Sequence, residues 1–95
     1  MELMKGSDDW NVFADIFNLF KKYYAVPKGQ FSTNPEVQEY WKKLISDSDD
    51  ISDKYKDTGA HELANRLVIS VINEFEYRSL KENDRNERNF KNAAN

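Results

Sequence analysis

The chain has 95 residues, no cysteine and a formal net charge of -3. This length supports one domain with one hydrophobic core, and the lack of cysteine excludes disulfide bonds, thiol catalysis and thiolate metal sites. The balance of 14 basic against 17 acidic side chains disfavours direct nucleic-acid binding, which normally uses a basic face. Without a signal-peptide pattern or a run of about 20 apolar residues, we expect a cytoplasmic protein that does not enter a membrane.

The first predicted helix covers residues 8–25, where apolar side chains recur every three or four positions. They form two neighbouring arcs on the helix. The first arc consists of Trp10, Phe13, Ala14, Phe17, Phe20 and Tyr24. The second arc consists of Val12, Ile16, Leu19 and Tyr23. We expect the first arc to form the core and the second to remain for a partner.

The second predicted helix covers residues 34–57. Its start is indicated by the sequence TNPE at 33–36, where Thr33 and Glu36 have capping-box spacing and Pro35 lies in the first turn. Its apolar positions are Val37, Tyr40, Trp41, Leu44, Ile51 and Tyr55. A break near Ser46–Ser48 is an open alternative, because Ser and Asp side chains compete for backbone hydrogen bonds.

The third predicted helix covers residues 59–81. Its sequence ELANRLVISVINEF is also compatible with a buried strand, but no other segment has the alternation of a strand that could pair with it. The polar, Asn-rich residues 83–95 are expected to form a flexible, disordered tail. The sequence therefore predicts an all-α, three-helix bundle over residues 1–82, followed by this tail.

The first and third segments carry more apolar surface than a three-helix bundle needs. If the four side chains of the second arc stayed in water, the fold would lose the free energy of burying them, about 1.5–3 kcal/mol each and roughly 6–12 kcal/mol together. This loss is comparable to the stability of a whole small domain. We therefore expect an interface with a second copy or another protein. Its candidate residues are Val12, Ile16, Leu19, Tyr23, Ile69 and Tyr77. The alternative is that the three helices and Phe31 bury all of this surface within one chain.

No motif for catalysis, a cofactor or a metal ion is found, so we expect a protein that is not an enzyme. His61 is the only histidine and has no acidic partner at a useful spacing. The run SDSDDISDKYKD fits a calcium loop at two ligands only. An acidic surface is predicted on the second helix, formed by Glu36, Glu39, Asp47, Asp50, Asp53 and Asp57. Such a face is usually only solvated, but it could also imitate a phosphate backbone.

Three stretches, WNVFADIFNLFKKYY, VQEYWKKLISDSDDISDKYKD and LANRLVISVINEFEYRS, resemble small helical proteins of phages, prophages and other mobile elements of Gram-positive bacteria. The resemblance rests on aromatic spacing over residues 8–80 and implies a cytoplasmic accessory protein without an assigned activity. We expect a homodimeric protein–protein interaction module. The alternatives are an acidic inhibitor of a nucleic-acid-handling host enzyme and a nucleic-acid-binding accessory protein.

Overall fold

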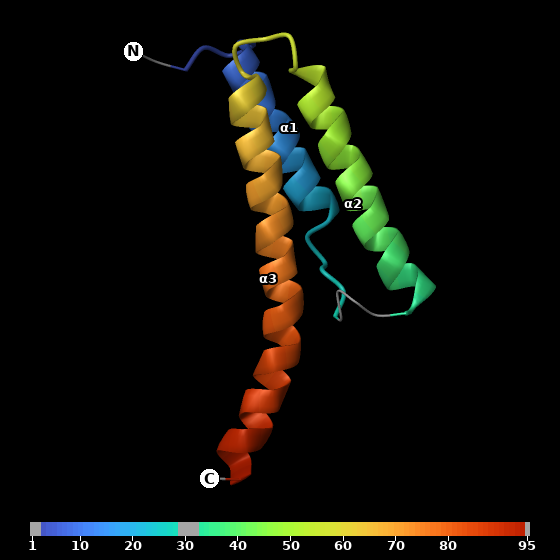
Figure 1. Cartoon of the computed structure of the whole chain (residues 1–95). Helices are drawn as coiled ribbons and strands as arrows, with labels where there is room; N and C mark the ends of the chain where they lie inside the picture. Colours follow the sequence, from blue (N-terminus) through green and yellow to red (C-terminus); the bar gives the residue numbers. More distant parts are fainter. Residues whose placement is uncertain (1–2, 29–32, 95) are drawn as a thin grey trace.

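The structure is a computed structural model that describes the backbone of residues 3–28 and 33–94, with side chains as far as Leu80. It contains three helices, α1 (Asp8–Lys22), α2 (Pro35–Lys54) and α3 (His61–Ala94), and no strand within these residues. Helices α1 and α3 run in the same direction and α2 runs antiparallel to both (Figure 1). The predicted all-α, three-helix fold is confirmed, including the helical assignment of the third segment.

Helix α3 gives the molecule its elongated shape. It contains 34 residues, so at 1.5 Å per residue it is about 50 Å long and accounts for the longest dimension of the molecule, 54 Å. In Figure 1 it extends past the ends of α1 and α2, beyond the predicted range 59–81. Residues 83–94, which the sequence predicted as part of a flexible tail, continue the backbone of α3, and their side chains lie outside the described part of the chain.

Helix α1 begins where the sequence offers a cap. The side chain of Ser7 accepts a hydrogen bond from the Trp10 amide at 3.2 Å. Acidic side chains in the first turn and basic side chains in the last turn complement the helix dipole. The helix ends at Lys22, and Tyr23 is its C-cap, so it is shorter than the predicted range 8–25.

The start of α2 differs from the prediction by one residue. The N-cap is Asn34 and not Thr33, and its side chain accepts a hydrogen bond from the Glu36 amide at 2.8 Å. Pro35 explains the shift, because a residue before proline favours the extended conformation that an N-cap adopts. The helix is continuous through Ser46–Ser48, since the Ser48 hydroxyl donates to the Leu44 carbonyl at 2.7 Å and leaves the helical bonding intact.

The core consists of two clusters of buried side chains, one at each end of the bundle. The first contains Leu19, Tyr23, Leu44, Val68, Val71 and Phe75. The second contains Val12, Tyr55, Ala60 and Ala64. The half-buried Ile16 and Ile51 pack against both clusters and join them into one core. Phe31, which the sequence offered as a further cover, lies outside the described residues.

This core corrects the prediction for the two arcs of α1. Val12, Leu19 and Tyr23, expected to face a partner, are only 0%, 4% and 5% exposed. Ile16 is half-buried beside them. The first arc, expected to be core, lies mostly on the surface instead. The assignment of these four residues to an interface is therefore wrong.

There is a physical reason why the second arc of α1 faces the core and the first arc faces outward. An apolar pattern gives the width of the apolar sector of a helix, but not which part of that sector turns inward. The second arc carries compact aliphatic side chains that let the helices approach closely. It is also bordered by Asp15 and Lys22, which find polar partners on α2. Only Phe20 of the first arc packs inward, with its ring stacked on Phe75 at 5.1 Å between centroids.

Candidate protein-interaction surface

Two similar clusters of polar side chains connect α1 to α2. In one, Asp47 accepts hydrogen bonds from Lys22 Nζ at 2.8 Å and from the Tyr23 hydroxyl at 2.5 Å. In the other, Asp15 accepts them from Lys54 Nζ at 2.8 Å and from the Tyr55 hydroxyl at 2.6 Å. Each cluster has an aspartate from the middle of one helix and a Lys-Tyr pair from the end of the other. We call them the Asp47 clamp and the Asp15 clamp.

The clamps come from a short repeat in the sequence. An aspartate is followed after six residues by Lys-Tyr at 15–23 and again at 47–55. Because α1 and α2 are antiparallel, each aspartate meets the Lys-Tyr pair of the other helix, and the two helices are related by an approximate two-fold axis. Among the clamp residues, Tyr23 was predicted at an interface and Asp47 on the acidic surface, and no contact was predicted for Asp15, Lys22 or Lys54. The repeated pattern was the signal that could have revealed them.

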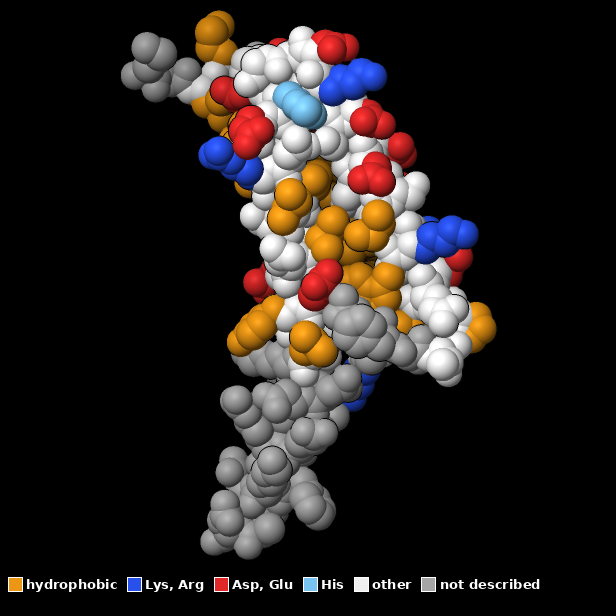
Figure 2. Space-filling model, viewed as in Figure 1, with side chains coloured by type: hydrophobic (Ala, Val, Ile, Leu, Met, Phe, Trp, Pro, Cys, Tyr) orange, Lys and Arg blue, Asp and Glu red, His pale blue; other side chains and the backbone are white. Residues whose placement is uncertain are grey.

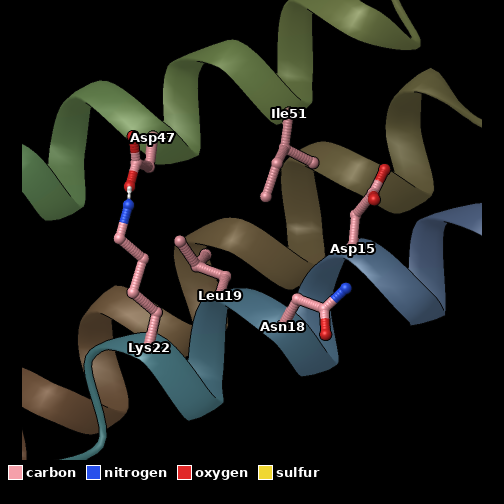
Figure 3. A pocket seen from close by; sticks show the side chains of 6 residues that line it. All are labelled: Asp15, Asn18, Leu19, Lys22, Asp47 and Ile51. Carbon is pink, nitrogen blue, oxygen red and sulfur yellow. Dashed lines mark hydrogen bonds and ion pairs between the residues drawn. The ribbon is translucent and has the colours of Figure 1, made fainter.

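A shallow groove of about 250 Å³ lies between the two clamps. Figure 3 shows Leu19 and Ile51 pointing into the gap between the helices and Lys22 reaching across to Asp47. The lysine and the Tyr23 hydroxyl hold the pKa of Asp47 below its ordinary value. Because both aspartates already hold a lysine and a tyrosine, the groove offers no unpaired acid to a ligand. We interpret it as part of the α1–α2 packing.

Tyr40 adds a half-buried hydroxyl beside the Asp47 clamp. It donates a hydrogen bond to the backbone carbonyl of Tyr23 at 2.6 Å, and the two rings meet edge to face at 5.5 Å. Burial raises the pKa of Tyr40 to about 12, with a further contribution from the neighbouring Tyr23. Burial also raises the pKa of Tyr55, and the hydrogen bond to Asp15 adds to the effect. These hydroxyls stabilise the bundle in their neutral forms.

The predicted acidic surface is present only in part. Asp47 turns toward α1 as the acceptor of its clamp, so its assignment to the solvent face is corrected. Glu39 is exposed and lies 3.8 Å from Lys43. The remaining predicted acids are exposed and take part in no ion pair within the described residues; they are Glu36, Asp50, Asp53 and Asp57. The run SDSDDISDKYKD at 46–57 lies largely on the continuous helix α2, which is not the geometry of a calcium loop.

The most unusual surface of the molecule is the outward side of α1. Trp10, Phe13, Phe17 and Tyr24 are 39%, 49%, 64% and 61% exposed, respectively. Their spacing of three, four and seven residues puts them along one side of the helix. Tyr24 follows the C-cap, and its ring meets Phe20 edge-on at 5.6 Å. We call these four residues the aromatic stripe.

The aromatic stripe is bordered by charged side chains and by the flank of α3. The guanidinium of Arg78 lies 5.1 Å from the ring centre of Phe20 and 5.4 Å from that of Tyr24. It also binds Glu74 through Nε at 2.7 Å. Lys21 lies 5.5 Å from the ring centre of Phe17. The stripe is therefore an apolar strip with positive charge at the end near Tyr24.

A second group of exposed apolar side chains lies on α2 and α3. The predicted interface residues Ile69 and Tyr77 are indeed on the surface, at 54% and 57% exposure, together with Ile45 and Leu80. Figure 2 shows apolar side chains gathered along the junction of α2 and α3. Because Ile69 and Tyr77 point in different directions from α3, they do not form one continuous strip as the α1 aromatics do.

The described residues offer little for other kinds of site. They contain no cluster of three or more His, Cys, Asp or Glu side chains that could hold a metal ion. His61 begins α3, and its Nε2 lies 3.3 Å from Nδ2 of Asn65, a partner within its own helix. Within the described residues, no helix has the length and apolar character needed to cross a membrane.

Comparisons with known proteins add no identity to this picture. No protein-family model, no curated protein and no solved structure matches the chain.

Proposed function

We propose that the protein is a non-enzymatic interaction module that forms a homodimer through the aromatic stripe of α1. The observation that carries this proposal is the exposure of three aromatic side chains on one side of α1, together with Tyr24 directly after its C-cap. Aromatic residues are enriched at the centres of protein interfaces, where they supply most of the binding energy. A stripe of this kind on a well-ordered helix is typical of helix-mediated recognition.

The size of the stripe agrees with a small interface. An aromatic side chain buries about 150–250 Å² when covered, so four half-exposed side chains offer roughly 300–500 Å² per copy. Two copies together approach the roughly 1,000 Å² that a specific interface needs once the bordering side chains are included. A contact of this size is at the low end of specific interfaces, where weak and transient complexes are found, and fits a reversible dimer rather than a permanent one.

The stripe also has features that suit a second copy of the same chain. It is apolar along its length, so two stripes can exclude water from each other. Its charged border includes both signs, with acidic side chains in the first turn of α1 and basic side chains in the last. A surface that carries its own complement favours association of identical chains, which is most often two-fold symmetric.

Light scattering coupled to size exclusion tests this proposal with a pair of matched variants. The wild-type chain is expected to show a dimer mass at tens of micromolar. Phe17→Asp places a charge in the stripe and is expected to give a folded monomer with unchanged circular dichroism. Ile69→Asp makes the same change at a similarly exposed site on α3 and is expected to leave the dimer intact. A monomeric wild type, or a dimer broken by Ile69→Asp alone, contradicts the proposal.

We place this module in the bacterial cytoplasm, as an accessory protein of a phage or another mobile element. Support comes from the resemblance of its three helical stretches to proteins of such elements.

A second candidate function is inhibition of a nucleic-acid-handling enzyme through the acidic side of α2. It is supported by the exposed carboxylates of Glu36, Asp50 and Asp53 on α2 and of Asp57 just after it, which take part in no ion pair within the described residues. Repeated negative charge is what a basic groove attracts. Binding of this kind falls steeply with salt, so a pull-down that retains a nuclease or helicase at 50 mM but not 500 mM salt supports it. Salt-insensitive capture contradicts it.

A further inference from the structure

We propose that the two copies pair antiparallel through α1, with Phe17 of both chains on the two-fold axis. This inference rests on the proposed dimer and specifies its geometry. In an interface between identical surfaces, residue i of one chain meets residue j of the other, and j meets i in return. The aromatic stripe has the spacing and the charge distribution that this reciprocity requires in the antiparallel orientation.

Two members of the stripe lie symmetrically about Phe17, while Phe13, four residues before Phe17, has Lys21 as its counterpart four residues after it. Trp10 lies seven residues before Phe17 and Tyr24 seven residues after it. Seven residues return to nearly the same side of a helix after about 10.5 Å. When a second stripe is laid antiparallel with its Phe17 opposite the first, each Trp10 lies level with the Tyr24 of the other copy. The pairing thus brings a large ring against a large ring at the centre and at both ends.

Charged groups at the two ends of the stripe lie on the same flank, the one that adjoins α3. Asp9 lies beside the start of α3, where it lines a hollow together with Ser7, Asp8, Gly59 and Ala60. Arg78 lies at the other end, over Phe20 and Tyr24. A two-fold axis perpendicular to α1 keeps this flank on the same side in both copies while it exchanges the ends. Asp9 of each copy is therefore brought toward Arg78 of the other.

Engineered cysteines test the orientation, because the natural chain has none. Ala14 and Lys21 lie on the edge of the stripe away from α3 and are both exposed. In the antiparallel pair their levels agree within about 1.5 Å, so the double variant Ala14→Cys, Lys21→Cys is expected to form inter-chain disulfides under mild oxidation. In each single variant the two cysteines lie at least about 9 Å apart, beyond disulfide reach, and little cross-linking is expected.

The outcomes separate this inference from the proposed dimer. Efficient cross-linking of the double variant, with little in the single variants, supports the antiparallel pairing. A wild type that is dimeric by light scattering, combined with no cross-linking of the double variant, overturns the orientation while the dimer stands. Self-cross-linking of Trp10→Cys also overturns it, because only parallel chains bring the two residues at position 10 together. A monomeric wild type overturns both proposals.

A charge reversal gives a second test that leaves the aromatic rings untouched. Asp9→Lys places a positive charge near Arg78 of the other copy at two symmetric points. It is expected to weaken the dimer about 2- to 30-fold, with a smaller effect at high salt. Asp50→Lys is the matched control, because it makes the same charge reversal at an exposed site on α2, which does not carry the stripe. Equal effects of the two substitutions contradict the antiparallel pairing.

Discussion

Removing the tyrosine hydroxyl from either clamp tests how α1 is held against α2. Tyr23 is 5% exposed and donates to Asp47 at 2.5 Å, and Tyr55 is 2% exposed and donates to Asp15 at 2.6 Å. A hydrogen bond to a charged group contributes about 1.5–3 kcal/mol to stability. Each aspartate keeps its lysine and some contact with water, so we expect Tyr23→Phe and Tyr55→Phe to cost about 1–2 kcal/mol each.

The approximate symmetry of the clamps makes this prediction stricter. The two single variants are expected to agree within about 0.5 kcal/mol, and the double variant to show the sum of their effects, because the clamps are separate sites. Urea unfolding followed by circular dichroism measures these free energies, and the melting temperature should fall by about 4–8 °C per kcal/mol. All chains are compared at one protein concentration, because association adds to apparent stability.

The matched control is Tyr24→Phe, which removes a hydroxyl from a side chain that is 61% exposed. It is expected to change the free energy of unfolding by less than about 0.5 kcal/mol. If the two clamp variants are as stable as this control, the hydroxyl bonds do not fasten the helices and the account of the α1–α2 packing is wrong.

Three further predictions follow from the same contacts. Leu19→Asp is expected to abolish the helical circular dichroism signal while Phe17→Asp retains it, because Leu19 is 4% exposed and a buried charge costs several kcal/mol, about 4 or more. The pKa of Asp47 is lowered, so its contribution to stability is present above the ordinary value of 3.8 and is lost as pH falls toward the folded pKa. Urea titrations between pH 6 and pH 2.5 should therefore show a smaller loss for Asp47→Asn than for the wild type; equal losses contradict this. The pKa of Tyr40 is raised to about 12, so its contribution is present below pH 10 and is lost as pH rises to 12. Tyrosinate absorbance should show a late component that Tyr40→Phe reduces by one tyrosine, while the raised pKa values of Tyr23 and Tyr55 keep part of it. A late component of unchanged size in that variant contradicts the assignment.

The sequence predicted the fold because the helix signals were local. Turn residues separated the three segments, and apolar spacing of three and four indicated helices throughout. The cap of α2 was misplaced by one residue, since two adjacent residues, Thr33 and Asn34, are both good caps and only the effect of Pro35 on its neighbour separates them.

Apolar spacing alone could not predict which part of α1 faces inward. Both arcs are apolar, so the free energy gained by burying apolar surface does not decide which of them turns inward. The choice depends on partners on α2, which only the folded arrangement provides. The repeat that places Asp15 against Lys54 and Asp47 against Lys22 was present in the sequence, and it marks the inward side of α1. The sequence predicted exposed apolar surface on α1, but the residues that form it are those of the aromatic stripe.

Fluorescence of Trp10 measures directly whether a second copy covers the aromatic stripe. In a Trp41→Phe chain, Trp10 is the only tryptophan, and it is 39% exposed in the single molecule. We predict that acrylamide quenches it strongly in dilute solution and weakly at tens of micromolar, with a transition at the same concentration as the rise in mass. Quenching that is independent of concentration, or a dimer in which Trp10 stays as accessible as before, contradicts the account.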